Sequence, residues 1–423
     1  MTLDNATSQQ RPVVEIAVVG PGLMGLGIAQ VAAAAGLRVG LVGRDAAASA
    51  AGRARLATKL ARQVERGRLA APEAQALLAR VIAVHDDAEL ADCGVAIEAV
   101  PEQRALKAAV LQRLQAALPP YALIATNTSG LPVSGLALSL LQPERFVGLH
   151  FFSPVERMKL VEVVRGAATS DTTLRAALDF VVRLGQTPIV VRDGPGFFTS
   201  RVFAAYLDEA IALVAEGHDP ARIEAAAGAL GRSVGPLALL DDISLTLNLQ
   251  QIEQARADGL PPERCRPLAA PVLAAMVAAG RCGRRQGGGF FDSAADGTRT
   301  PWPGLADRFA RAAVPAGEDS LSLRLRLAEV MEALRCLEDG VIASADDADT
   351  ASVLGLGFPT AAGGVLRWAE NVGLPTLVAR ADELARTHGP RFLPSPWLRG
   401  VAAAGSSGLQ PWRASNSETI TSP

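Results

Sequence analysis

The sequence is poor in the residues that build metal sites and disulfides. Its 423 residues include only four cysteines and four histidines. Cys93, Cys265, Cys282 and Cys336 stand alone, without partners at metal-ligand spacing, and the histidines form no local cluster. We therefore expect no metal ion, and we expect the thiols to be buried or incidental.

The sequence also has few lysines, a small net charge and no long apolar run. Lys59, Lys107 and Lys159 are the only lysines, the formal net charge is −2, and no uninterrupted apolar run is long enough to span a membrane. A balanced charge favours neither nucleic acid nor a membrane as partner. The first residues lack a basic region followed by an apolar core, so no secretory signal is expected. These features predict a globular cytoplasmic protein of two or three domains.

A glycine-rich turn follows the first strand pattern. The apolar residues 13–19 precede Gly20-Pro21-Gly22-Leu23-Met24-Gly25, after which a helix of small residues extends to about residue 35. In such a unit the first glycine permits the turn, the second lets the backbone approach a diphosphate, and the third lets the helix pack against the strand. The pattern predicts a dinucleotide site; the alternative is a merely glycine-rich turn.

The end of the next expected strand, residues 37–42, bears on the choice of cofactor. An NAD-binding protein usually has an acidic residue there, which binds the ribose 2'-hydroxyl. Here the position is Gly43, and Arg44 follows it. Loss of the acid and gain of a guanidinium favour the 2'-phosphate of NADP. The alternative is that Arg44 is solvated and that Asp45 takes the place of the acid.

Strand patterns recur through the first half of the chain and mostly alternate with helical stretches. They are expected at residues 81–84, 95–100, 123–126, 146–152, 160–164 and 189–191. The alternation predicts a doubly wound, Rossmann-type α/β domain over residues 1–190, with its site at the carboxyl ends of the strands. Glu98, Glu102, Asn127, Thr128 and Ser129 lie at or after such ends. Taken alone, Ser129 is better explained by a turn that caps the next helix.

Two of these strands carry an ionisable residue where an apolar one would pack better. His150 lies in the strand at 146–152 and Glu162 in the strand at 160–164, on either side of a Ser-Pro break. Because the connection is short, the strands can pair, so that Glu162 accepts a hydrogen bond from one ring nitrogen while the other acts as a base. A buried structural His–Glu pair explains the same pattern, and this stretch alone does not decide between them.

The character of the sequence changes after residue 190. A mainly helical domain is expected over residues 191–292, followed by a polar linker over residues 293–320. Residues 332–340 then match residues 209–217 in spacing, which indicates a second copy of the helical unit over residues 321–405. Residues 406–423 have little to bury and predict a disordered tail.

Together, these motifs resemble those of the L-3-hydroxyacyl-CoA dehydrogenases, and more closely the dehydrogenase portion of the bacterial fatty-acid oxidation multienzyme alpha subunit. The resemblance covers about residues 13–405 and rests on GPGLMGLGIA, EAVPEQRALK, NTSGLPV, GLHFFSPVERMKLVEVV, DGPGFFTSR and GLGFPTAAGG. It implies a Rossmann-type domain followed by two tandem all-α C-terminal-type domains. It also implies an acyl-CoA substrate, NAD or NADP as cofactor, and a role in beta-oxidation or related fatty-acid metabolism. The subunit's hydratase domain has no counterpart here, so no hydratase activity is expected.

The resemblance also implies roles for single residues. His150 would remove the proton of the 3-hydroxyl group, Glu162 would orient its ring, and Ser129 would hydrogen-bond the reacting oxygen. Ser200 stands where the family has an asparagine that contacts the substrate, and we expect the loss of that contact to cost on the order of 1–3 kcal/mol. The implied cofactor contacts are Gly20, Gly22, Leu23, Met24, Gly25, Arg44, Glu98, Glu102, Lys107 and Asn127.

Two other functions stay open on the sequence alone. A different beta-hydroxyacid dehydrogenase would share the domain order but usually relies on a lysine in its second domain, and no lysine follows Lys159. A catalytically silent acyl-CoA-binding or scaffold homologue is favoured only by Ser200. The duplication predicts that residues 201–291 pack against residues 321–405 with pseudo-two-fold symmetry, which leaves the chain a monomer or a weak homo-oligomer. The resemblance leaves open a thiolase as partner.

Overall fold

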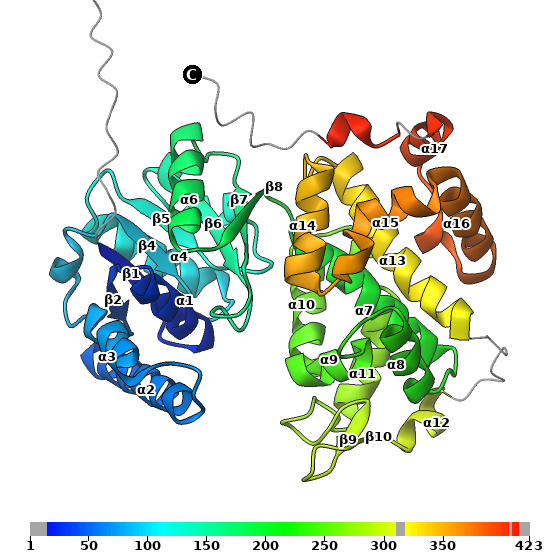
Figure 1. Ribbon diagram of the computed structural model, residues 1–423, viewed down its shortest axis with the longest axis horizontal. Helices are drawn as coiled ribbons and strands as arrows, with labels where there is room; N and C mark the ends of the chain where they lie inside the picture. Colours follow the sequence, from blue (N-terminus) through cyan, green and yellow to red (C-terminus); the bar gives the residue numbers. More distant parts are fainter. Residues whose placement is uncertain (1–14, 310–317, 406–407, 414–423) are drawn as a thin grey trace, which may run out of the picture. The chain divides into compact units, whose positions relative to one another are not determined.

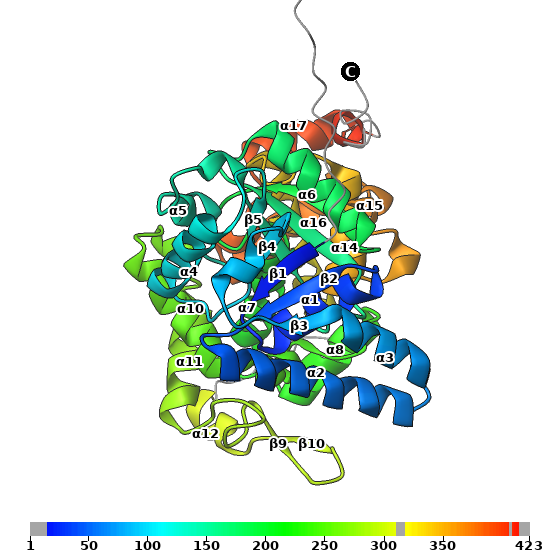
Figure 2. The same cartoon turned by 90° about the vertical axis from the view of Figure 1, so that its left-hand side faces the viewer.

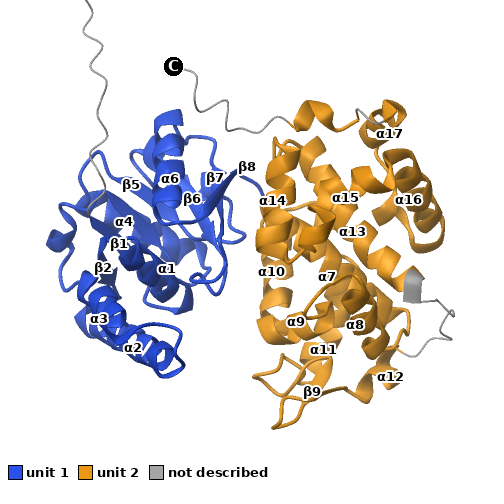
Figure 3. Ribbon diagram, in the orientation of Figure 1, with its two compact units in different colours: residues 1–194 blue, residues 195–423 orange. Residues whose placement is uncertain are grey.

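The computed structural model describes residues 15–309, 318–405 and 408–413. The chain divides between Gly194 and Pro195 into two units, which Figure 3 colours separately. In the described ranges, no helix has both the length and the apolar character needed to cross a membrane.

The first unit is built on one eight-stranded sheet with the order β3-β2-β1-β4-β5-β6-β7-β8. Its strands are β1 (Glu15–Val19), β2 (Arg38–Val42), β3 (Val81–Ala83), β4 (Val95–Glu98), β5 (Leu123–Thr126), β6 (Phe146–Phe151), β7 (Leu160–Arg165) and β8 (Thr187–Arg192). The first six strands are parallel, β7 is antiparallel to β6, and β8 is parallel to β7. Figure 2 shows β3, β2, β1 and β4 side by side. The first six strands have the doubly wound Rossmann order, so the predicted α/β fold class is confirmed.

Helices connect the strands of this sheet and shield it from water. They are α1 (Leu23–Ala34), α2 (Ala46–Glu65), α3 (Ala71–Arg80), α4 (Arg104–Ala117), α5 (Val133–Ala137) and α6 (Asp171–Arg183). β4, β5 and β6 are buried along their whole length, as expected for parallel strands covered on both faces. Their residues are mostly small or branched and apolar. The ionisable Glu98 and His150 stand out among them, because a buried charge requires a partner.

The second unit consists of two tandem sets of helices, as predicted (Figure 1). The first set is α7 (Thr199–Ala215), α8 (Pro220–Ala229), α9 (Pro236–Ile243), α10 (Leu245–Ala257) and α11 (Ala269–Ala278). The second set is α13 (Glu318–Glu338), α14 (Ala345–Leu356), α15 (Val365–Val372), α16 (Leu374–His388) and α17 (Pro396–Ala403). One hydrophobic core contains Tyr206 and Ile211 of α7 together with Leu321 and Leu325 of α13. The two sets therefore fold as partners.

The segment predicted as a linker, residues 293–320, is folded in its first part. The strands β9 (Phe291–Ser293) and β10 (Arg299–Pro301) form an antiparallel pair, and α12 (Gly304–Phe309) follows. Trp302 lies under two guanidinium groups, those of Arg281 at 4.8 Å and Arg308 at 4.9 Å from the ring centroid. The polar composition predicts a linker, whereas the partly buried Trp302 packs this stretch against the core of the second unit. Residues 310–317 lie outside the described residues.

The tail predicted as disordered, residues 406–423, is likewise folded where the structure describes it, at residues 408–413. Arg413 forms ion pairs with three carboxylates, those of Asp346 at 2.8 Å, Asp349 at 2.5 Å and Glu370 at 2.7 Å. The ring of Trp412 meets that of Trp397 edge to face at 5.3 Å. These contacts correct the prediction for residues 408–413. Residues 406–407 and 414–423 lie outside the described residues.

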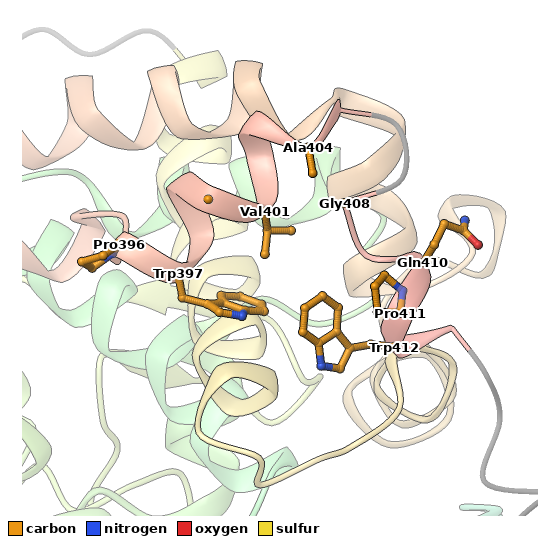
Figure 4. Close-up of a pocket in the computed structure, with 9 residues that line it drawn as sticks. Pro396, Trp397, Val401, Ala404, Gly408, Gln410, Pro411 and Trp412 are labelled. Atoms are coloured by element: carbon orange, nitrogen blue, oxygen red, sulfur yellow. The ribbon is translucent and has the colours of Figure 1, made fainter.

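A hollow of about 700 Å³ lies beside this pair of indole rings (Figure 4). Its lining comes from α17 and the turn at residues 408–412: Pro396, Trp397, Gly400, Val401, Ala404, Gly408, Gln410, Pro411 and Trp412. None of these side chains is ionisable, so the hollow supplies no general acid or base.

Candidate active site

The glycine turn between β1 and α1 has the geometry that a dinucleotide requires. Gly20 has a φ of 105°, and a Cβ added there would lie 2.5 Å from the carbonyl oxygen of Ala99. A Cβ on Gly25 would lie 1.9 Å from the carbonyl oxygen of Gly20. At Gly22, by contrast, no described atom lies within 4 Å of an added Cβ, and no side chain caps this end of α1. The residues present therefore fit a diphosphate at the N-terminus of α1.

The surroundings of this turn were only partly predicted. Leu23 is 75% exposed beside it, whereas Met24 packs against the core. Arg55 of α2 donates a hydrogen bond of 2.7 Å to the carbonyl oxygen of Pro21. A Cβ on Gly52 would lie 2.4 Å from the Cβ of Pro21, so α2 presses directly on the turn. No local pattern indicates that residues 52 and 55 lie beside residue 21.

A pocket of about 270 Å³ opens at the end of β2. It is lined by Val42, Gly43, Arg44, Asp45, Ser49, Val84, His85, Asp86, Asp87 and Arg113. A Cβ on Gly43 would lie 2.6 Å from the backbone nitrogen of Ser49, so this backbone leaves no room for an acidic side chain at position 43.

The three carboxylates of the pocket already have partners. Asp45 caps α2 by accepting from the Ala48 N–H at 2.7 Å. Asp86 accepts from the Ala88 N–H at 3.0 Å, and Asp87 binds both ends of the Arg113 guanidinium. Arg44 is 90% exposed along its side chain, and Asp45 approaches it at 3.3 Å. Arg44 is therefore the more exposed side of an ion pair whose acid, Asp45, is itself 54% exposed.

Glu98, at the end of β4, anchors a buried polar network. Its carboxylate accepts from the Lys107 ammonium at 2.8 and 3.1 Å, from the Thr126 hydroxyl at 2.6 Å and from the Val100 N–H at 2.6 Å. Lys107 also donates to the Val100 carbonyl at 3.2 Å and pairs with Glu102 at 3.2 Å. Both Glu98 and Lys107 are buried. The ammonium thus has three different acceptors within the protein, which satisfies its three hydrogens.

Glu102 fixes the loop after β5. It accepts hydrogen bonds from the Thr128 hydroxyl, from the Ser129 N–H at 3.1 Å and from the Gly130 N–H at 3.2 Å. Burial alone would raise the pKa of Glu102. The Lys107 ammonium and the hydrogen bonds from Thr128 and Gly130 outweigh burial and hold that pKa below its ordinary value. The sequence places Thr128 at the expected edge but predicts no role for it or for Thr126; in the structure their hydroxyls hold Glu102 and Glu98 respectively.

His150 and Glu162 face each other across the antiparallel pair of β6 and β7. Directly opposed residues of such a pair project to the same side of the sheet. The His150 Nδ1 lies 2.7 Å from the Glu162 Oε2, and both side chains are buried. The Phe152 ring packs against the imidazole at 4.5 Å between centroids. The predicted contact between the two residues is therefore present.

Asn127 follows β5 and hydrogen-bonds to the strands on either side of it, β4 and β6. Its side-chain oxygen accepts from the Phe151 N–H at 2.9 Å, and its own N–H donates to the Glu98 carbonyl at 2.7 Å. Because β1, β4, β5 and β6 are parallel, their carboxyl ends lie on one edge of the sheet. That edge carries every residue predicted for the site except Ser200, which lies in α7 of the second unit.

Comparisons with known proteins agree with this arrangement. The family model for the NAD binding domain of 3-hydroxyacyl-CoA dehydrogenase matches residues 15–194, and the model for the C-terminal domain of the same enzyme matches residues 196–293.

Solved structures of two such enzymes align with most of their own length. The 3-hydroxybutyryl-CoA dehydrogenase from Escherichia coli K12 is 28% identical, with a TM-score of 0.80, over 94% of this chain and 100% of that one. The (S)-3-hydroxybutyryl-CoA dehydrogenase from Ralstonia eutropha is 34% identical, with a TM-score of 0.62, over 66% of this chain and 98% of that one.

Proposed function

This chain belongs to the 3-hydroxyacyl-CoA dehydrogenase family, and we propose that it interconverts a (3S)-3-hydroxyacyl-CoA and the corresponding 3-oxoacyl-CoA by means of the His150–Glu162 pair. It is an oxidoreductase with NAD or NADP as cofactor. The observation that supports the proposed machinery is the 2.7 Å contact between the His150 Nδ1 and the Glu162 Oε2, at the edge of the sheet where the glycine turn lies.

We assign His150 the role of general base in the oxidation direction. Its Nδ1 contacts Glu162, and we assign to Nε2 the uptake of the proton of the 3-hydroxyl group. The Glu162 carboxylate fixes the ring and stabilises the imidazolium that forms. The glycine turn and Glu102 would hold the cofactor, whose nicotinamide would supply the acceptor for the hydride of carbon 3. In the reverse direction the protonated His150 returns its proton to the oxygen.

Ser129 and Ser200 are the proposed substrate contacts. Glu102 holds the backbone N–H of Ser129, so the position of the serine hydroxyl is set by the network behind it. We propose that this hydroxyl donates to the reacting oxygen.

We propose that Lys107 lies behind the residues that contact the cofactor. Its ammonium has three acceptors inside the protein, so it supports the cofactor site by positioning Glu102. Glu102, Asn127 and the glycine turn are the proposed cofactor contacts at the edge of the sheet, with Glu98 behind them.

Turnover can be tested directly with acetoacetyl-CoA and either reduced cofactor, by following the nicotinamide absorbance. The proposal requires oxidation of NADH or NADPH that depends on the CoA ester. Binding of the ester without turnover would instead support a silent homologue, and turnover of a beta-hydroxyacid without CoA would support a different dehydrogenase. A thiolase partner stays a prediction.

We expect Arg44→Ala to weaken NADP binding about tenfold while NAD binding changes by less than about twofold. The reason is the loss of one charge-assisted contact to the 2'-phosphate, which is worth about 1.5 kcal/mol or more. Dissociation constants from fluorescence titration measure both effects. Arg62→Ala is a matched control, since Arg62 is an exposed arginine of α2 outside the pocket. A parent protein that binds NAD tightly and ignores NADP contradicts the assignment.

Ser200→Asn restores the residue that the family uses at this position. We expect it to raise kcat/KM for acetoacetyl-CoA by on the order of tenfold, because it restores one polar contact worth about 1–3 kcal/mol. The cofactor dissociation constant should not change. Steady-state kinetics at several ester concentrations give the answer, and a decrease in kcat/KM would show that this chain has adapted to serine.

A further inference from the structure

The two sets of helices in the second unit face each other with reciprocal ion pairs. Extending the match between residues 209–217 and 332–340 backward without a gap aligns Arg201 with Arg324. Arg201 binds Glu332 at 2.6 Å, and Arg324 binds Glu209 at 2.5 Å. Because Glu209 and Glu332 are also counterparts, the two ion pairs are equivalent between the repeats.

The same reciprocity appears at the ends of these helices. Arg201 reaches Asp339 at 3.2 Å, and Arg324 reaches the corresponding Glu216 at 2.5 Å. Across a two-fold axis, each contact between two positions occurs twice, once in each direction, as it does here. The axis passes between α7 and α13, which Figure 1 draws in green and yellow.

One cluster breaks this symmetry. The alignment pairs Tyr206 of α7 with Glu329 of α13, and Phe203 with Arg326. Arg232, which follows the left-handed Gly231 after α8, corresponds to Phe358, which follows the left-handed Gly357 after α14. A carboxylate and two guanidinium groups therefore occupy positions whose counterparts carry aromatic rings. Charges and rings form one cluster, because Arg232 lies over the Tyr206 ring at 4.9 Å.

The charged groups of this cluster are buried, and two guanidinium groups share one carboxylate. Arg232 pairs with Glu329 at 2.5 Å, and Arg326 pairs with the same carboxylate at 3.3 Å. Their side chains are 5%, 4% and 1% exposed for Arg232, Arg326 and Glu329. Arg326 also stacks on Phe358 at 3.9 Å.

Glu329 is therefore the one carboxylate that compensates both guanidinium groups in this cluster, as far as the described residues show. The Nε of each arginine and the hydroxyl of Tyr206 have no hydrogen-bond partner there. Removing the carboxylate would leave buried charges uncompensated, which is strongly destabilising.

We propose that this cluster makes the pairing selective: the face of the first repeat accepts the second repeat of the chain and rejects a second copy of itself. In a self-paired first repeat, Tyr206 would stand where Glu329 now stands, and Phe203 would replace Arg326. Two copies of Arg232 would then be buried without a carboxylate. The surface that pairs the repeats is thus specific for a partner that carries the acid.

The full-length variant Arg326→Phe with Glu329→Tyr tests the inference, because it gives the second repeat the residues of the first at these two positions. We expect the melting temperature of the second unit to fall by on the order of 10 °C, since Arg232 loses its carboxylate. Differential scanning calorimetry measures the shift. A variant within about 2 °C of the parent would overturn the proposal.

Adding Arg232→Phe to this double variant separates charge from packing. Phenylalanine is the residue of the second repeat at the corresponding place, so the triple variant has an uncharged cluster. We expect it to regain at least half of the lost melting temperature. If it melts as low as the double variant, the loss came from packing and the cluster does not govern the choice of partner.

Discussion

His150→Ala is expected to lower kcat for acetoacetyl-CoA reduction, and for the reverse oxidation, by about 10³-fold. An alcohol is a poor acid, so hydride departure requires that a positioned base takes the hydroxyl proton, and such bases contribute about 10²–10⁴-fold. The dissociation constant of the cofactor should change by less than about threefold, because the glycine turn and the pocket after β2 are formed by other strands.

Two further variants distinguish a base from a structural pair. His150→Gln keeps a polar side chain on β6 but supplies no base, so it should lose as much activity as His150→Ala. Glu162→Gln keeps the ring in place and removes the compensating charge, so a smaller loss, of about 10–100-fold, is expected. Rapid-mixing kinetics with a melting curve for each protein separate lost chemistry from lost folding. A His150 variant with near-parental turnover would falsify the assignment of the base.

The parts of the site that the sequence predicted are those fixed by local patterns. The glycine turn follows from the spacing of three glycines between a strand and a helix. The contact between His150 and Glu162 follows from a short connection between two strands, which sets their register. In both places neighbouring residues determine the geometry.

The parts that were missed depend on contacts between residues far apart in the chain. The carbonyl oxygen of Pro21 is held by Arg55 from another helix. The burial of Lys107, an implied cofactor contact, likewise depends on Glu98 and Glu102, which pair with its ammonium. Residues 408–413 look like part of a polar tail until Arg413 meets three carboxylates of the second repeat. The composition of a segment does not show which distant residues will form ion pairs or hydrogen bonds with it.

Deleting residues 321–423 is expected to turn a monodisperse monomer into aggregates. The deletion uncovers Tyr206 of α7, which now shares a core with Leu321 and Leu325, and leaves Glu209 and Arg232 without their partners. In the intact chain the second repeat is tethered by a short connection, so its effective concentration is of order millimolar, well above that of a separate chain. Pairing within the chain therefore prevails, and we propose that the full-length protein is monomeric or only weakly associated.

Light scattering coupled to size-exclusion chromatography, over a hundredfold range of concentration, tests both halves of this prediction. The full-length chain should elute with the mass of one copy at each concentration, and the truncated chain should show polydisperse, concentration-dependent mass. Cofactor binding by the truncated chain serves as a control for its first unit, which has its own core. The opposite result, a full-length dimer that survives dilution beside a soluble monomeric truncation, would show that the second repeat serves another purpose. In that case the reciprocal ion pairs of Arg201 and Arg324 would be a remnant of the duplication and would not determine the oligomeric state.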